Sequence, residues 1–216
     1  MKHFKFLNKV LNFSAERYLK TAGDLFIYDG DYESALYMVD KTLGMEPNDT
    51  RALVLRGDIL YCLNRDIESL QTFNQVLKLD ENCVEAYISK ASVLEVLGKD
   101  RDALECCNKA LELMANGKVY LRATVYEQKL TLLIRLKKYR EAKQLLDEAC
   151  DKISRDELQY LAGSFMPVLE RHVRDSVEHR KNLRARASEL SLRVIPGSGP
   201  STPSDPIEGE LKAQPQ

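Results

Sequence analysis

The chain has 216 residues, and its 32 Lys and Arg nearly balance its 33 Asp and Glu, leaving a net charge of −1. This balance provides no overall basic field, which argues against a nucleic-acid-binding protein. The hydrophobic content of 44% is that of a globular protein, and no apolar run approaches the roughly 20 residues that a membrane-spanning helix needs.

Residues 1–15 predict an amphipathic helix ahead of the rest of the chain. Its lysines fall on one face, and its apolar side chains, such as Phe4, Leu7 and Leu11, fall on the other. This helix would either cap the segment that follows or, through residues 1–14, lie on a membrane surface or a partner as a basic interfacial helix. The sequence leaves both interpretations open.

From residue 16 the sequence repeats itself with a period of 34 residues. Within each unit, apolar residues recur twice at three- and four-residue steps, which predicts two amphipathic helices around a short break. A fixed period of this size predicts a stacked array of helix pairs. The matched columns are Leu19/Leu53/Tyr87, Gly23/Gly57/Ala91, Phe26/Leu60/Leu94, Ala35/Ser69/Ala103, Val39/Phe73/Cys107 and Leu43/Leu77/Leu111.

Small residues and turn formers have a physical place in this pattern. The columns that begin at Gly23 and Ala35 fall where the two helices of a unit must approach closely. Pro47 is expected to end a second helix, and Asn48 or Asp49 can cap the next one. The break inside each unit carries residues that tolerate the left-handed backbone wanted there, namely Gly30, Asn64 and Gly98.

These residues resemble tetratricopeptide repeats, a family of 34-residue helix–turn–helix units. Three units match in register, and a fourth matches after a five-residue insertion at 118–122. The resemblance implies an all-α fold: a right-handed superhelical solenoid of about four repeats with N- and C-terminal capping helices. It also implies that the first helix of each repeat lines a concave groove and the second lies on the convex side. The predicted repeats are 16–49, 50–83, 84–117 and 123–153.

The segment after the array predicts C-terminal capping helices over residues 154–194. Ser154–Glu157 has the spacing of a capping box that opens a helix. Gly163-Ser164 is expected to break that helix before a longer one begins. The Pro-, Gly- and Ser-rich residues 195–216 predict a disordered tail. The longer helix has apolar residues that would pair with a second copy in a homo-oligomer, namely Leu183, Leu190 and Val194.

No grouping of residues predicts catalysis. The sequence has no phosphate-binding glycine loop, nucleophile elbow or H-E-x-x-H motif. Its cysteines are odd in number, form no C-x-x-C pair and lie far in sequence from the three histidines, which suits neither disulfides nor zinc. The basic N-terminus has no uninterrupted apolar core for a signal peptide. We therefore expect a cytoplasmic protein that is not an enzyme and uses no cofactor or metal.

The cysteines fit structural positions better than reactive ones. Cys107 lies in the Val39/Phe73 core column and is expected to be buried. Cys150 falls in the column of Leu43 and Leu77, and we expect it to be buried as well.

The groove that the resemblance implies is the candidate binding site. Its carboxylates, Asp24, Asp58, Glu95 and Glu127, would lie in line and favour a basic peptide. Tyrosines such as Tyr28 and Tyr61 would supply contact area. Ile27 and Cys62 are expected beside them. The predicted groove residues are Lys20, Asp24, Tyr28, Val54, Asp58, Tyr61, Ile88, Ser92, Glu95, Glu127, Thr131 and Arg135.

A carboxylate clamp for the C-termini of heat-shock chaperones is not expected. Family members with that clamp use Lys and Asn on the first repeat, Asn on the second, and Lys and Arg on the third. Asp24 and Glu85 would instead repel a carboxylate. The matching residues are Lys20, Asp24, Leu55, Glu85 and Ser89, of which Lys20 alone agrees. One repeat later they are Val54, Asp58, Ser89, Thr124 and Gln128, and none agrees.

The sequence therefore predicts a protein–protein interaction module that acts as an adaptor, assembly factor or chaperone-like holder. The partner would be a protein or peptide segment bound in the groove. Two alternatives stay open: a homo-oligomeric scaffold held by the terminal helices, and a membrane-surface adaptor that uses residues 1–14.

Overall fold

The computed structural model describes residues 14–114 and 121–192, apart from the side chains of Val173 and of residues 175–180 and 182–192. The chain divides into two units, Met1–Glu170 and Arg171–Gln216. The first unit holds the repeats, and the second holds the end of the last helix.

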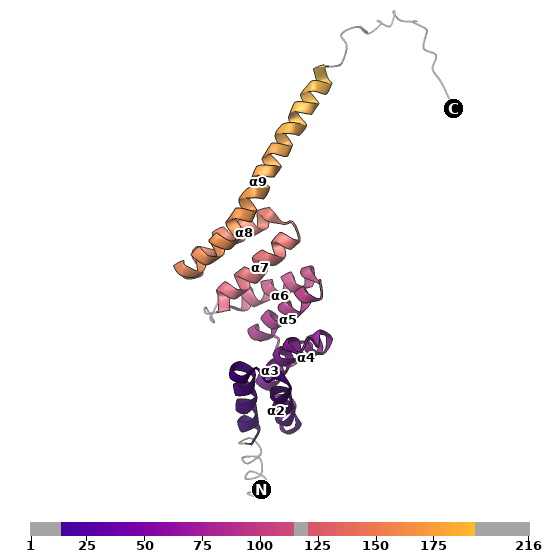
Figure 1. Cartoon of the computed structure of the whole chain (residues 1–216), viewed down its shortest axis with the longest axis vertical. Helices are drawn as coiled ribbons and strands as arrows, with labels where there is room; N and C mark the ends of the chain where they lie inside the picture. The colour runs from indigo at the N-terminus through magenta and orange to yellow at the C-terminus, as the bar shows by residue number, and fades with distance from the viewer. Residues whose placement is uncertain (1–13, 115–120, 193–216) are drawn as a thin grey trace, which may run out of the picture. The chain divides into compact units, whose positions relative to one another are not determined.

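Every regular element in the described residues is a helix, which confirms the all-α prediction (Figure 1). The first helix covers residues 14–24 and continues into a π-helical turn, η1 (Leu25–Asp29). The helices that follow are α2 (Tyr32–Met45), α3 (Thr50–Cys62), α4 (Asp66–Leu79), α5 (Val84–Val96), α6 (Asp100–Leu113), α7 (Arg122–Arg135), α8 (Tyr139–Ala149) and α9 (Arg155–Leu192).

The helices form two layers. Each helix from α2 to α7 packs against the next one along the chain. In addition, α3 packs against α5 and α5 against α7, so the first helices of successive repeats lie side by side. We call the helix of residues 14–24 with η1, together with α3, α5 and α7, the first helices. The second helices, α2, α4, α6 and α8, form the other layer of this repeat superhelix.

The breaks inside the repeats have the left-handed backbone that their residues predict. The φ angles are 66° at Gly30, 58° at Asn64 and 70° at Gly98. Lys137 adopts the same conformation in the fourth repeat, with φ of 59°. Glycine and asparagine tolerate this region better than lysine does, which is why the sequence pattern reveals the first three breaks more clearly.

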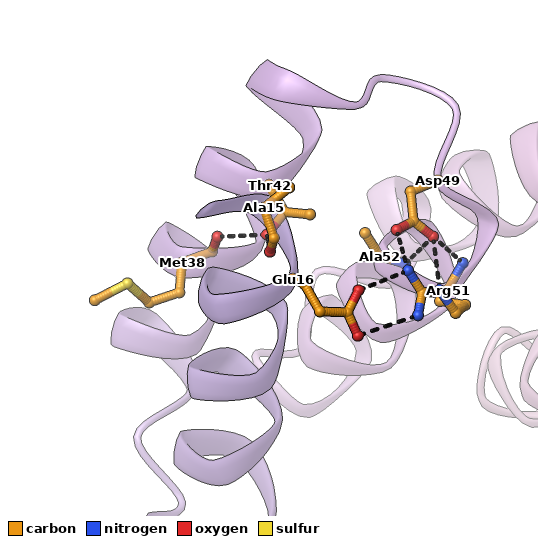
Figure 2. Close-up of polar contacts among 7 residues, drawn as sticks. All are labelled: Ala15, Glu16, Met38, Thr42, Asp49, Arg51 and Ala52. Carbon is orange, nitrogen blue, oxygen red and sulfur yellow. Dashed lines mark hydrogen bonds and ion pairs between the residues drawn. The ribbon is translucent and has the colours of Figure 1, made fainter. Parts of the chain in front are cut away.

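Polar contacts join the first helix to α2 and α3 (Figure 2). The buried Thr42 hydroxyl donates to the carbonyl oxygen of Ala15 at 3.3 Å. Asp49 caps α3 as predicted, because its carboxylate accepts the backbone N–H of Arg51 at 2.9 Å. The Arg51 guanidinium lies 3.0 Å from a carboxylate oxygen of Glu16 as well. Most of the predicted N-terminal helix, residues 1–13, lies outside the described residues.

The small-residue columns behave differently from repeat to repeat. A Cβ atom on Gly57 would lie 2.6 Å from the Phe73 ring, so the predicted close approach is confirmed there. The Ser69 hydroxyl, from the second small column, donates to the Gly57 carbonyl at 2.8 Å in the same contact. A Cβ on Gly23 would meet nothing within 4 Å, so the prediction is wrong for Gly23, whereas Ala35 of the same repeat is fully buried.

The last helix differs from the prediction. Ser154 and Glu157 form the predicted capping box, with the Ser154 N–H donating to Glu157 at 2.9 Å and the Glu157 N–H donating to Ser154 Oγ at 3.3 Å. The predicted break at Gly163-Ser164 is wrong, because α9 runs through it and through Pro167. Leu161 and Leu169 on either side are buried in one cluster with α7 and α8 residues. This packing outweighs the roughly 1 kcal/mol that glycine costs within a helix.

We predict that Gly57→Ala destabilises the chain by about 1–3 kcal/mol, because the added methyl must displace the buried Phe73 ring. Gly23→Ala is the matched control, and it should be neutral or stabilising by up to about 1 kcal/mol, since its Cβ meets open space. Urea unfolding followed by circular dichroism measures both changes. Equal effects of the two substitutions would contradict this account of helix packing.

Candidate peptide-binding groove

The first helices have their most exposed large hydrophobic side chains at the N-terminal end of the layer. Tyr28 is 80% exposed and Ile27 is 68% exposed, both within η1. Asp24 and Lys20, one and two turns earlier, are exposed too. The π-helical turn widens the end of this helix, with the Gly30 N–H donating to the Leu25 carbonyl. Such turns often occur at functional sites.

The middle of the layer holds Asp58 in a half-buried polar setting. Burial raises the pKa of this carboxyl to about 6, and a hydrogen bond with Ser89 of α5 opposes the rise. Cys62 follows one turn later, and its exposed thiol interacts with Tyr32. Desolvation and the nearby Asp58 raise the pKa of Cys62. The Cys62 thiol is therefore not an activated nucleophile.

A glutamine joins the third and fourth repeats. Gln128 of α7 donates from its amide nitrogen to the Ser92 hydroxyl of α5 at 2.9 Å. Its amide oxygen accepts from the buried Cys107 thiol at 3.5 Å. Ile88, one turn before Ser92, packs against the hydrophobic core. Ser92 and Ile88, both predicted groove residues, therefore contribute to contacts between repeats.

An arginine joins the same two repeats at the other end of these helices. Arg135 of α7 donates to the Glu95 carboxylate at 3.0 Å and lies 2.9 Å from Asp100 Oδ1 at the start of α6. This Asp100 oxygen is buried and accepts no hydrogen bond from the described residues. The ion pair with Arg135 is its contact with a positive charge. Arg135 therefore neutralises two carboxylates across one repeat boundary.

The fourth repeat is contacted by the beginning of α9. The Tyr160 hydroxyl donates to the Glu127 carboxylate at 3.1 Å. The Thr131 hydroxyl is also occupied, since it donates to the Glu127 backbone carbonyl at 3.0 Å. The C-terminal end of the candidate groove is thus bonded internally.

The structure divides the predicted groove residues into three sets. Those at the N-terminal end are exposed: Lys20, Asp24 and Tyr28. Those at the centre are half-buried, with Val54 and Tyr61 packed against a core cluster and Asp58 hydrogen-bonded with Ser89. The others have a contact between elements or a hydrogen bond within the helix: Ile88, Ser92, Glu95, Glu127, Thr131 and Arg135. Sequence reasoning missed the partners Ser89, Gln128, Asp100 and Tyr160, because helical spacing alone does not show which side chains meet across repeats.

Two cysteine predictions have opposite outcomes. Cys107 is fully buried as predicted, and burial raises its pKa to about 12, so it stays a thiol. The prediction of a buried Cys150 is wrong, because this residue is exposed. The helix α8 ends at Ala149, so Cys150 lies just past the face that its repeat column shares.

Among the described residues, no group of histidine, cysteine or acidic side chains is arranged to hold a metal ion. None of the helices in this part of the chain has the length and apolarity needed to cross a bilayer. The apolar residues proposed for self-association, Leu183, Leu190 and Val194, have side chains outside the described part of the structure.

The comparisons with known proteins agree with this geometry. No protein-family model matches the sequence, and no curated protein matches it. Among solved structures, the alignment with the protein MamA spans 86% of this chain and 98% of the MamA chain, with a TM-score of 0.58 and 15% identity. YrrB, described as a TPR protein with an unusual peptide-binding site, covers 71% of this chain and 76% of its own, with a TM-score of 0.55 and 20% identity.

The chain has the tetratricopeptide-repeat fold. The first repeat domain of RPAP3 (Spaghetti), solved with the HSP90 peptide SRMEEVD, supports the same conclusion. It covers 57% of this chain and 94% of its own, with a TM-score of 0.52 and 17% identity. At these identities the likeness concerns the tetratricopeptide-repeat architecture, and the residues of the groove are this chain's own.

We predict that Arg135→Gln lowers the free energy of unfolding by about 1–2 kcal/mol, because it leaves the buried Asp100 oxygen without a cation. The exposed Arg140, on α8, provides the control Arg140→Gln, which should change stability by less than about 0.5 kcal/mol. Urea unfolding at two salt concentrations measures both. Indistinguishable variants would show that Arg135 does not hold the repeat boundary.

Asp58 should make stability fall with rising pH. Its folded pKa of about 6 lies above the unfolded value of about 3.9, so the folded chain holds this proton more tightly. The stability that comes from this preferential protonation is fully present below about pH 4, and it is lost as the pH rises through about 6. Relative to wild type, Asp58→Asn should therefore gain roughly 1–3 kcal/mol of stability between pH 4 and pH 7. The exposed Asp24→Asn is the control, and parallel profiles for Asp58→Asn and wild type would refute the assignment.

Proposed function

We propose that residues 16–153 form a non-enzymatic protein-interaction module that binds a peptide segment along the first helices. The observation that carries this proposal is the set of exposed side chains on η1 and the turns before it. Aromatic and branched side chains such as Tyr28 and Ile27 provide contact area at low entropy cost, and they are exposed at 80% and 68%.

The chemistry of the open half indicates what it would bind. Asp24 is exposed beside these apolar side chains, and Asp58 is half-buried at the centre. Glu95 and Glu127, in contrast, already accept bonds from Arg135 and Tyr160. A partner segment with a basic residue next to an apolar anchor would complement the N-terminal half of the groove.

This chemistry differs from that of a clamp for acidic C-termini. RPAP3 was solved with an HSP90 peptide, but the residues of this chain at the clamp positions include Asp24 and Glu85. We therefore propose a role as an adaptor, assembly factor or chaperone-like holder for a basic segment. A cytoplasmic location is part of this proposal, since the described structure contains its five cysteines as free thiols.

The triple substitution Asp24→Asn, Ile27→Ser and Tyr28→Ala should abolish capture of the specific partner, because it removes the open contacts without touching an interrepeat bond. Affinity purification with mass spectrometry from the native host, with tagged full-length chain, measures this. The triple substitution leaves Glu95 and Asp58 unchanged, because replacing either of them would also disturb a contact between repeats.

A matched control makes the same chemical changes on the second helices: Tyr37→Ala, Ile67→Ser and Asp147→Asn. Tyr37 and Ile67 are each 58% exposed, and Asp147 is exposed on α8. The control should keep the partner that the groove variant loses. Retention of the same partner by both variants would move binding to the terminal helices or the second-helix layer, and capture of the chain itself alone would favour the scaffold.

A further inference from the structure

The second-helix layer contains two equivalent depressions, one repeat apart. The first lies between α4 and α6, encloses about 480 Å³ and is lined by Lys90 of α5. The second lies between α6 and α8, encloses about 550 Å³ and is lined by Lys129 of α7. A tyrosine one turn before each lysine, Tyr87 or Tyr126, lines the same depression. We call them the outer depressions.

The preceding repeat shows what the basic residue at this position needs. Arg56 is equivalent to Lys90 and Lys129 in the repeat register. Its guanidinium lies 2.9 Å from the Asp40 carboxylate of α2 and donates to the Thr72 hydroxyl of α4 at 3.0 Å. The cation is thus neutralised by a carboxylate from the neighbouring second helix, and this contact ties the first two repeats together.

The next two repeats lack these partners. Asp40 is replaced by Asn74 and then by Asn108, neither of which can neutralise a cation. Cys106 and then Leu145 stand where Thr72 stands in the second repeat. The basic residue has been kept while its acidic partner has been lost.

Both lysines are half-buried, and neither has a hydrogen bond or ion pair with another described residue. Burial lowers the pKa of Lys129, and the charge of Glu148, which lines the same depression, opposes that effect. A half-buried ammonium without a partner is a favourable place for an anion, because the cost of desolvating the cation has already been incurred during folding.

The remaining charges around the depressions are mostly engaged or exposed. Lys109 pairs with Glu112 at 3.2 Å. Arg122 donates to the backbone carbonyls of Met114 and Lys152 at 2.7 and 3.3 Å. The exposed acids of the rims are Asp102, Glu105, Glu112 and Glu148, and the exposed amines are Lys99, Lys109 and Lys152.

We propose that the two outer depressions bind two carboxylate side chains of one acidic segment of a partner protein, one in each repeat. A polymeric ligand is favoured over a free anion because the same cation recurs at the same place one repeat later on the same layer. The apolar walls, with Leu70 and Leu94 in the first depression and Leu111 and Leu145 in the second, suit the methylene groups of glutamate.

Fluorescence anisotropy with the full-length chain tests this, using a labelled peptide of alternating glutamate and serine as the probe and its glutamine analogue as the neutral comparison. Lys90→Gln with Lys129→Gln should weaken glutamate-peptide binding by about tenfold or more. Lys78→Gln with Lys143→Gln makes the same charge change at exposed positions of α4 and α8, and it should weaken binding by less than about twofold.

A second pair of variants keeps both lysines and restores the partner that Arg56 has. Asn74→Asp with Asn108→Asp should also weaken binding of the glutamate peptide by about tenfold. Each new carboxylate would form an ion pair with the lysine ammonium of its depression and so exclude the peptide carboxylate. The control Gln71→Glu with Gln144→Glu adds the same charge at exposed sites of the second helices. Comparison of the two pairs separates binding of peptide carboxylates at the two lysines from general electrostatic attraction between the chain and the peptide.

Four outcomes overturn the proposal: no binding of the glutamate peptide at low ionic strength, equal binding of the glutamine analogue, equal loss in the site and control variants, or a mass that rises with concentration and is reduced by the lysine variants. The last result would assign the depressions to a second copy of this chain. The groove variant at Asp24, Ile27 and Tyr28 should leave peptide binding unchanged, so the proposed function is tested independently.

Discussion

The contact between Gly57 and Phe73 determines how closely the two helices of the second repeat can lie. The Phe73 ring occupies the space where a Cβ would stand, and the buried Ser69 hydroxyl donates to the Gly57 carbonyl beside it. Phe73 then packs in one cluster with Ala86 and Val93 of the third repeat. A single hairpin therefore leaves part of its apolar face for its neighbour, and the packing of successive hairpins places the first helices α3, α5 and α7 side by side.

Much of this architecture could be predicted from the sequence, because its causes are local and periodic. Asn64 and Gly98 mark breaks because their backbone must be left-handed, and Asp49 marks a helix start because its carboxylate accepts a free N–H. The column that contains Phe73 and Cys107 is buried in every described repeat because its period matches that of the stack. These features depend on residue type and spacing alone.

Contacts between repeats could not be predicted in the same way. Arg135 was expected to face a ligand, yet it joins Glu95 to Asp100, and the bridge made by Gln128 has no signature in the 34-residue pattern. Such pairings depend on how two helices are placed relative to each other. The continuity of α9 through Gly163 has a similar cause, since buried leucines on either side outweigh a weak local propensity. The candidate groove is therefore exposed at one end and internally bonded at the other.

Hydrogen–deuterium exchange of the full-length chain, alone and with the partner that the purification recovers, shows where the partner binds. Binding along the first helices should give new protection there, strongest from Asp24 through η1 and in α3, with little change in the exchange of α9. A preformed groove should also leave the protection of the core helices nearly unchanged on binding. Protection confined to α9 or to residues 1–13 would contradict the groove as the site of function.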